Sequence, residues 1–159
     1  MEINILNAHI GICSIILLFL IFKEIQEIFY LRSKLFFITG NYKIKNKNNL
    51  IQIKNYLNKE ILYDSNKKNA RRPILRHSSK QILESNYGFC GENARVAIKL
   101  LILGGIKANR IYLHGEKWGH VVTENKWENK WYLFDCHYDP LTKMNDNEGQ
   151  FELHTLFNQ

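Results

Sequence analysis

The pattern of apolar and polar positions divides the chain into a long N-terminal helix and a folded domain. A dense apolar run occupies residues 10–22, where Ser14 is the polar exception. Helical periodicity then continues in a largely apolar stripe made of Ile25, Ile28, Phe29, Arg32, Leu35 and Phe36. Polar residues 39–49 interrupt this pattern. We therefore expect a hydrophobic helix within residues 1–38 and a separate domain over residues 39–159.

The apolar run has the character of a membrane anchor, although it is short for one. As a helix, residues 10–22 would extend about 20 Å, against the ~30 Å hydrocarbon core of a bilayer. Extension back to Ile5 gives a spanning length but includes Asn7 and His9. We expect a single-pass anchor, with burial against the domain or a partner as the alternative. A cleaved signal peptide is disfavoured, because no basic side chain precedes the run and no small-x-small site follows it.

Charge on the two sides of the apolar run predicts its orientation. Glu2 is the charged residue that precedes the run. The basic residues that follow it are Lys23, Arg32, Lys34, Lys43, Lys45 and Lys47. The positive-inside rule places this basic side in the cytoplasm. The sequence thus predicts a membrane-associated protein with a cytoplasmic C-terminal domain, and a soluble cytoplasmic protein is the alternative.

Within the domain, helical patterns come first and strand patterns follow. One helix is predicted from the spacing of Leu50, Ile53, Leu57, Ile61 and Leu62, and a short second one follows Ser78 or Ser79 as its N-cap. A third begins near Cys90, carries Ala94, Ala97, Ile98, Leu101 and Ile102 on one face, and ends at Gly104 and Gly105. One strand is predicted at residues 110–115, and two strands joined by a polar turn are predicted within residues 120–135. This order predicts an α+β fold with helices before an antiparallel sheet.

Composition and charge narrow the function without identifying it. The 159 residues are 45% hydrophobic and 23% charged, which is ordinary for a globular protein. A net charge of +7 favours anionic partners. The basic residues are spread along the chain, however, and no helix-turn-helix or zinc-finger spacing is present. Nucleic acid is therefore not the expected partner, and a basic nucleic-acid binder is kept as a minority alternative.

The cysteines indicate a reducing compartment. There are three, Cys13, Cys90 and Cys136, and their odd number and spacing match no disulfide framework. A single bridge between Cys90 and Cys136 is the alternative if the domain is exported.

Cys90 lies in the stretch "YGFCGENARV", where a thiol would be well placed for nucleophilic chemistry. A thiol reacts as the thiolate, and the N–H groups and dipole at a helix start favour that negative charge. The same N–H groups, including that of Cys90, could bind a developing oxyanion. Gly88 and Gly91 would let a substrate approach the sulfur closely. The alternative is a buried structural thiol.

The thiol of Cys90 needs a base that accepts its proton, and the predicted hairpin contains a histidine that could serve as this base. If Glu128 and Asn129 form a two-residue turn, Asp135 lies opposite Val122 and diagonal to His120 on the same face. A turn of odd length would place the two on opposite faces. The spacing therefore allows Asp135 to orient His120, and His120 to take the proton of Cys90.

The motifs "YGFCGENARV", "GIKANRIYL", "GHVVTE" and "KWYLFD" together resemble the transglutaminase-like superfamily. Its members share a papain-like α+β core and a Cys–His–Asp triad, which fall here on Cys90, His120 and Asp135. Other shared features are Tyr87-Gly88, Gly105-Ile106, Arg110, Glu124 and Trp131-Tyr132. The resemblance implies acyl transfer on amide or peptide bonds, with a protein or peptide substrate and no cofactor.

Some positions depart from the family pattern, and they bear on the substrate. Val121 and Val122 follow His120 where a small and an aromatic residue are usual, Cys136 follows Asp135 in place of proline, and Phe89 precedes Cys90 where many transglutaminases have glutamine. We expect hydrolysis by a cysteine peptidase or amidase rather than cross-linking. The alternative is a non-catalytic, membrane-tethered binding module.

A metal site is not expected. The stretch "CHYD" at residues 136–139, with His114 nearby, is the one candidate, and its spacing matches no standard structural zinc pattern.

Overall fold

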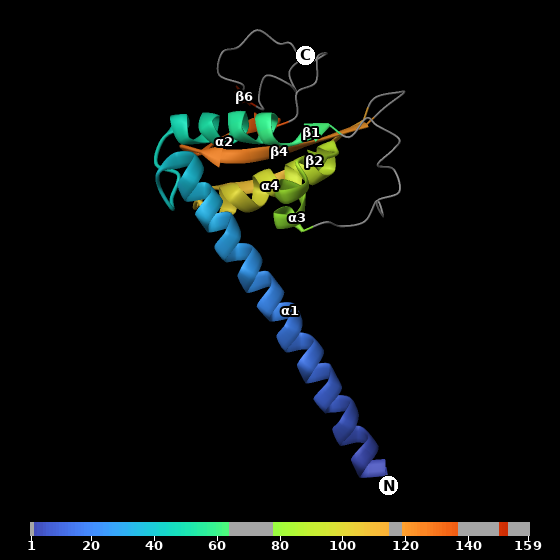
Figure 1. The fold of residues 1–159 in the computed structure, drawn as a ribbon. Helices are drawn as coiled ribbons and strands as arrows, with labels where there is room; N and C mark the ends of the chain where they lie inside the picture. The colour runs from blue at the N-terminus through green and yellow to red at the C-terminus, as the bar shows by residue number, and fades with distance from the viewer. Residues whose placement is uncertain (1, 64–77, 115–118, 137–149, 153–159) are drawn as a thin grey trace.

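The structure is a computed structural model that describes residues 2–63, 78–114, 119–136 and 150–152 (Figure 1). In these residues the helices are α1 (Glu2–Thr39), α2 (Lys47–Glu60), α3 (Ser79–Ser85) and α4 (Cys90–Leu103). The strands are β1 (Leu62–Tyr63), β2 (Tyr87–Gly88), β3 (Lys107–His114), β4 (Gly119–Trp127), β5 (Lys130–Phe134) and β6 (Gln150–Glu152). Strands β3 to β6 form an antiparallel sheet in chain order, and β1 pairs with β2 in parallel. The predicted α+β fold, with helices before the main sheet, is confirmed.

The core forms where the four helices α1 to α4 meet the sheet. Helix α2 buries Leu50, Ile53 and Leu57 completely, as its predicted stripe requires. Ile61 is also buried, whereas Leu62 leaves the helix and is exposed in β1. The same cluster includes residues from the end of α1, from α4 and from β5. Burial of these aliphatic side chains is the main stabilising contribution to the domain.

Helix α4 is fixed at both ends by local interactions. At its start the N–H of Phe89 donates to Glu92 Oε2 at 3.0 Å, so that the helix closes back on its N-cap residue. At its end Gly105 has φ of +88°, a left-handed conformation that suits glycine. A side chain at Gly104 would meet Ile44 Cδ1 at 2.6 Å. The predicted helix end at these two glycines is confirmed.

The hairpin of β4 and β5 has the predicted register. Glu128 and Asn129 both have positive φ, 47° and 65°, as a two-residue hairpin turn requires. Trp127 pairs with Lys130, and Thr123 pairs with Phe134. Asp135 directly follows β5 and, by this register, lies beside Val122. The turn thus brings the end of β5 toward the start of β4.

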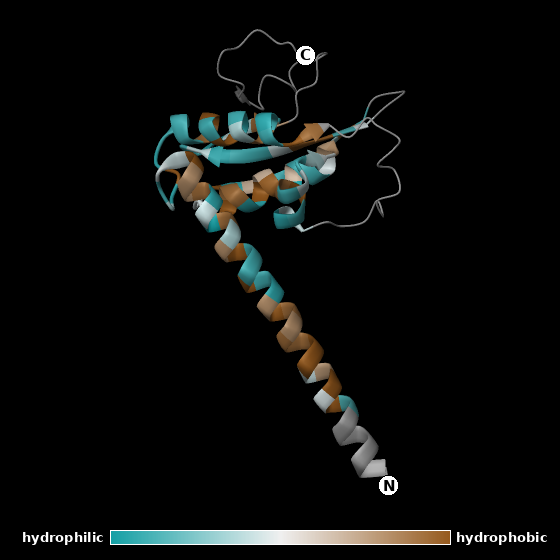
Figure 2. Cartoon of the chain, in the orientation of Figure 1, coloured by the Kyte–Doolittle hydropathy of each residue, from teal (hydrophilic) through white to brown (hydrophobic). Residues whose placement is uncertain are grey.

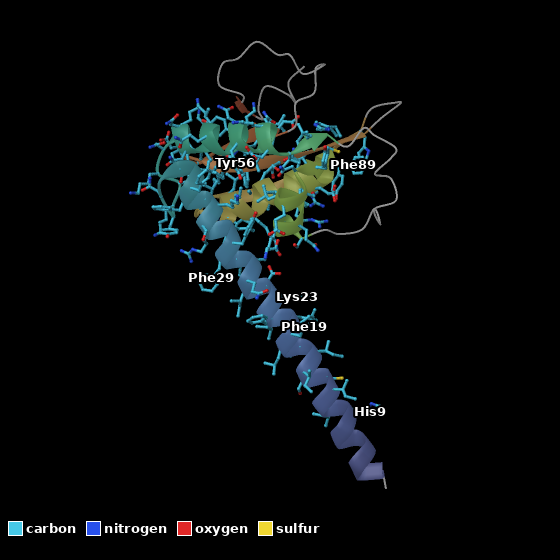
Figure 3. The ribbon with its side chains drawn as sticks, in the orientation of Figure 1. His9, Phe19, Lys23, Phe29, Tyr56 and Phe89 are labelled. Atoms are coloured by element: carbon cyan, nitrogen blue, oxygen red, sulfur yellow. The ribbon has the colours of Figure 1, made fainter. Side chains whose placement is uncertain are left out.

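The N-terminal part of α1 projects away from the domain, and its C-terminal part belongs to the core (Figure 1). The projecting part carries the apolar run 10–22, shown in brown in Figure 2, whose large side chains are exposed. Lys23 follows this run, with its ammonium 4.5 Å from the centre of the Phe19 ring (Figure 3). Within the described residues, no helix combines the length and apolar character that crossing a bilayer requires. The structure therefore gives no support to the predicted transmembrane helix.

The face of α1 that docks on the domain differs from the predicted stripe. The buried positions are Glu27, Leu31, Leu35 and Thr39. Of the predicted stripe, Leu35 is buried, but Phe29 is 69% exposed and points away from the domain (Figure 3). The apolar stripe therefore does not mark the docking face, because the buried face includes Glu27, a charged residue outside the stripe.

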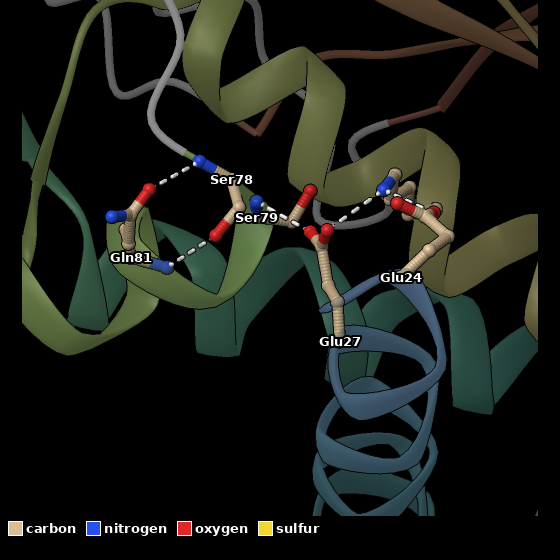
Figure 4. Close-up of polar contacts among 6 residues, drawn as sticks. Glu24, Glu27, Ser78, Ser79 and Gln81 are labelled. Atoms are coloured by element: carbon tan, nitrogen blue, oxygen red, sulfur yellow. Dashed lines mark hydrogen bonds and ion pairs between the residues drawn. The ribbon is translucent and has the colours of Figure 1, made fainter. Parts of the chain in front are cut away.

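Glu27 is buried because two groups bind its carboxylate, and one of them carries the opposite charge (Figure 4). The N–H of Ser79, at the start of α3, donates to Oε1 at 2.6 Å, and Lys99 Nζ of α4 lies 3.1 Å from Oε2. Lys99 also contacts Glu24 at 3.0 Å. Burial raises the pKa of Glu27, but the bonds from Lys99 and Ser79 outweigh it and hold the pKa below its ordinary value. This network joins α1 to both α3 and α4.

Helix α3 has the predicted N-cap. Ser78 accepts from the N–H of Gln81 at 3.2 Å, and the N–H of Ser78 donates to Gln81 Oε1 at 2.8 Å (Figure 4). This reciprocal pair is a capping box, and it leaves the N–H of Ser79 for Glu27.

Candidate active site

The structure brings Cys90, His120 and Asp135 together from three elements. Cys90 is the first residue of α4, His120 is the second residue of β4, and Asp135 directly follows β5. His120 Nε2 lies 2.8 Å from Asp135 Oδ2, and the His120 side chain also hydrogen-bonds to Cys90. Because Nε2 faces the carboxylate, Nδ1 is the ring nitrogen left for the thiol. The imidazole therefore stands between the sulfur and the carboxylate.

The electrostatics of the three groups favour a charged pair of thiolate and imidazolium. The hydrogen bond to Asp135, followed by that to Cys90, raises the pKa of His120 to about 10, although burial opposes this. The pKa of Cys90 is lowered, chiefly by its hydrogen bond with His120. The N–H groups of Val121 and Gly91 lower it further, while burial opposes them. Because the two groups share this proton, it belongs to the pair, and both shifts favour the state in which it resides on the imidazole.

The glycines beside Cys90 have different roles. A Cβ at Gly91 would find its nearest neighbour, Val121 Cγ2, at 3.9 Å, so Gly91 does leave space near the sulfur. A Cβ at Gly88 would lie 3.1 Å from Ile61 Cγ2. Gly88 is buried, and its small size serves the packing of β2 against the end of α2 rather than the approach of a substrate.

Two buried side chains that the sequence reading missed tie α4 to the hairpin. Asn93 Nδ2 donates to the carbonyl of Cys136 at 3.1 Å, and Thr123 Oγ1 donates to the carbonyl of Ala94 at 3.4 Å. Asn93 is 1% exposed and lines a small pocket together with Cys90 and Asp135. A polar residue three positions after Cys90, on a helix face that is otherwise aliphatic, was the available signal.

Cys136 lies next to Asp135 but is not equipped as a second nucleophile. It is buried, and burial, reinforced by the charge of Asp135, raises its pKa well above the ordinary value. All three cysteines are free thiols, so the alternative bridge between Cys90 and Cys136 is not formed.

The described residues do not test the whole of the metal-site candidate. Cys136 and His114 are among them, but residues 137–139 are not. Within the residues that the structure covers, no group of three His, Cys, Asp or Glu side chains could hold a metal ion.

The chain belongs to the transglutaminase-like domain family. The profile of that family matches residues 32–147, which is more than half of the chain and includes all three site residues. Comparison with curated proteins returns no significant match.

Solved structures share this fold. One is a provisionally assigned cysteine protease from Cytophaga hutchinsonii, with a TM-score of 0.56, 19% identity, and coverage of 79% of this chain and 41% of that one. A structure described as a TGase has a TM-score of 0.55 and 14% identity, and the match covers 79% of this chain and 35% of that one. A provisionally assigned protease from Parabacteroides distasonis has a TM-score of 0.54 and 15% identity, and the match covers 77% of this chain and 25% of that one. This chain thus spans less than half the length of each of them.

Proposed function

We propose that the protein is a thiol enzyme that transfers acyl groups from amide or peptide bonds through Cys90, His120 and Asp135. The observation that carries the proposal is the imidazole of His120, which bonds to Cys90 on one side and lies 2.8 Å from Asp135 on the other. This arrangement supplies a nucleophile, a base and an orienting group in contact. Membership of the transglutaminase-like family supports the same class of enzyme.

The reaction divides into two steps. The Cys90 thiolate attacks the carbonyl carbon, and the carbon–nitrogen bond breaks as the His120 imidazolium gives its proton to the leaving amine. The product of this step is a thioester on Cys90 and a free amine. Water then attacks the thioester, His120 takes one proton from that water, and the carbon–sulfur bond breaks to release the acid and restore the thiolate beside the imidazolium. Asp135 holds the ring and stabilises its positive charge in both steps.

Hydrolysis of a peptide is the form of the reaction that we favour. Two large exposed side chains, Phe89 and Leu113, are neighbours of the site residues. Leu113 pairs with His120 across the sheet, and Phe89 directly precedes Cys90. Apolar surface beside a nucleophile suits the side chains of a peptide better than a small polar amide. Transfer to an amine in place of water is the second outcome that the same chemistry permits.

Replacement of Cys90 tests the proposal directly. In a Cys13→Ser background, iodoacetamide should alkylate Cys90 rapidly at pH 6, and the additional Cys90→Ala change should abolish both this labelling and any peptide hydrolysis. Peptide-resolved mass spectrometry identifies the labelled site. Undiminished labelling or hydrolysis in the Cys90→Ala protein would contradict the assignment.

The alternative of a non-catalytic binding module makes a different prediction. It expects Cys90 to titrate near the ordinary thiol pKa of ~8.5. A midpoint near that value in the pH profile of alkylation would favour the module, and an acid-shifted midpoint favours the enzyme.

Membrane association of α1, with the domain on the cytoplasmic side, stays a proposal. Its support is the projecting run 10–22, where apolar side chains such as Ile15 and Leu18 are more than 60% exposed. A helix that is apolar on all sides favours apolar surroundings. Flotation of the full chain with anionic vesicles tests this, with a chain lacking residues 2–22 as the control. Failure of the full chain to float would contradict it.

A further inference from the structure

Asn93 is the buried polar side chain that connects the helix of Cys90 to the segment of Asp135. It lies three residues after Cys90, so the two share one face of α4. Its amide donates to the carbonyl of Cys136, the residue that follows Asp135. One side chain therefore bridges the element that carries the nucleophile and the backbone that carries the carboxylate.

Asp135 needs such support because it lies outside the sheet. Strand β5 ends at Phe134, so the ladder of hydrogen bonds with β4 holds the backbone as far as that residue. The bond from Asn93 to Cys136 is the next fixed point along the described chain. Asp135 is thereby held between two anchored neighbours, which restricts where its carboxylate can lie relative to His120 Nε2.

The surroundings of Asn93 argue against a role in stability alone. Its neighbours on the buried side of α4 are Ala94, Val96, Ala97, Leu100 and Leu101. Its own Oδ1 is buried and has no hydrogen-bond partner among the residues that the structure describes. A buried oxygen that has lost its bonds to water and gained none in the protein destabilises the folded state, so the core is not optimised for stability at this position. Such a group in a native structure calls for an explanation, and the position of Asn93 between Cys90 and the segment of Asp135 supplies one.

We propose that Asn93 is a positioning residue that sets the contact between Asp135 and His120 and, through it, the thiolate of Cys90. This inference rests on the proposed function. Loss of the amide donor would release the carbonyl of Cys136 and allow Asp135 to move away from Nε2. The imidazolium would then be less stabilised, and the proton would return to the thiol at a higher pH.

The test measures the pH profile of Cys90 alkylation in the full chain. The variants are Asn93→Ala, which removes the side chain, and Asn93→Leu, which removes the donor but keeps a similar volume in the core. In a Cys13→Ser background, both should move the alkylation midpoint to higher pH by about one unit, which corresponds to roughly tenfold slower labelling at pH 6. Thermal unfolding of each variant, followed by circular dichroism, shows whether it is folded.

Asn49 provides a matched control. It is also a buried asparagine, 5% exposed, and it bonds to Lys45 and Gln52 in and beside α2, on an element that carries none of the three site residues. Asn49→Ala should lower the unfolding temperature and leave the alkylation midpoint unchanged. This separates a general loss of stability from a change at the site.

The outcomes distinguish this inference from the proposed function. An acid-shifted midpoint in the parent chain, with the same midpoint in a folded Asn93→Leu protein, would overturn the role of Asn93 and leave the proposed function in place. An ordinary midpoint in the parent chain would overturn both. A raised midpoint in the Asn93 variants, absent from Asn49→Ala, is the expected result.

Discussion

At the scale of single residues, the start of α4 presents backbone donors that favour the anionic form of Cys90. Phe89 occupies the N-cap position, where serine, threonine, aspartate or asparagine would normally accept from the first N–H groups of the helix. A phenyl ring has no atom that can accept such a bond. The N–H of Gly91 bonds instead to the Cys90 sulfur, and it contributes to the lowered pKa of that thiol. Phe89 thus leaves a backbone donor to the thiolate, which gives this departure from the family pattern a physical reason.

A side chain at position 89 that caps α4 should therefore stabilise the helix and lower the reactivity of the Cys90 thiol. Asn in the Phe89→Asn variant can accept from the N–H of Gly91 or Glu92, which is worth about 1 kcal/mol in an ordinary helix. We expect this variant to unfold at higher urea concentration than Phe89→Leu, which lacks the acceptor, and yet to be alkylated more slowly at pH 6. Equal alkylation rates in the two variants would contradict this account of Phe89.

At the scale of elements, the sequence correctly predicted structural features that depend on residues close together in the chain, and it missed contacts between distant segments. The turn at Glu128 and Asn129 determines the register of β4 with β5, and this local feature correctly predicted that Asp135 would lie near His120. The docking face of α1 depends instead on Lys99, which is far away in the sequence. No periodicity in α1 reveals that Glu27 has this partner. The bridge from Asn93 to Cys136 was missed for the same reason, because its acceptor is a backbone carbonyl in another segment.

The contacts of Glu27 should contribute more to stability than those of Glu24, although both carboxylates bind Lys99. Glu27→Gln removes the charge from a side chain that is 8% exposed, whereas Glu24→Gln changes one that is 58% exposed. We expect Glu27→Gln to lower the free energy of unfolding by about 1–2 kcal/mol, since a buried charge-assisted bond is lost. Glu24→Gln should change it by less than about 0.5 kcal/mol, because exposed ion pairs contribute little.

Urea unfolding followed by circular dichroism measures this difference, and Glu24→Gln serves as the matched control. The same loss in both variants would show that burial of Glu27 does not govern the strength of the network.

At the scale of the whole molecule, α1 has two parts with different relations to the domain. The part from Glu27 onward contributes Leu31 and Leu35 to the core and joins α3 and α4 through Glu27. The part before Lys23 projects from the domain, and the large side chains of its apolar run 10–22 are exposed (Figures 1 and 3). The predicted domain boundary after residue 38 would separate the docked part of α1 from the domain. A truncation near residue 22 would leave that docked part in place.

Two truncations should therefore have opposite effects on the fold. A chain that begins at Lys23 keeps all the α1 side chains that the structure describes as buried, so we expect its unfolding temperature to stay within about 2 °C of the full chain. A chain that begins at Gly40 loses Leu31 and Leu35, and with them the contacts of Glu27. Burial of each leucine contributes about 1.5–3 kcal/mol, and domains of this size are stable by only about 5–15 kcal/mol, so the second truncation should leave little or no cooperative transition.

Thermal unfolding by circular dichroism, with Cys90 alkylation at pH 6 as a second measurement, distinguishes these outcomes. A stable, reactive protein beginning at Gly40 would show that the whole of α1 is an appendage, and a marked loss of stability in the protein beginning at Lys23 would show that the projecting part supports the fold.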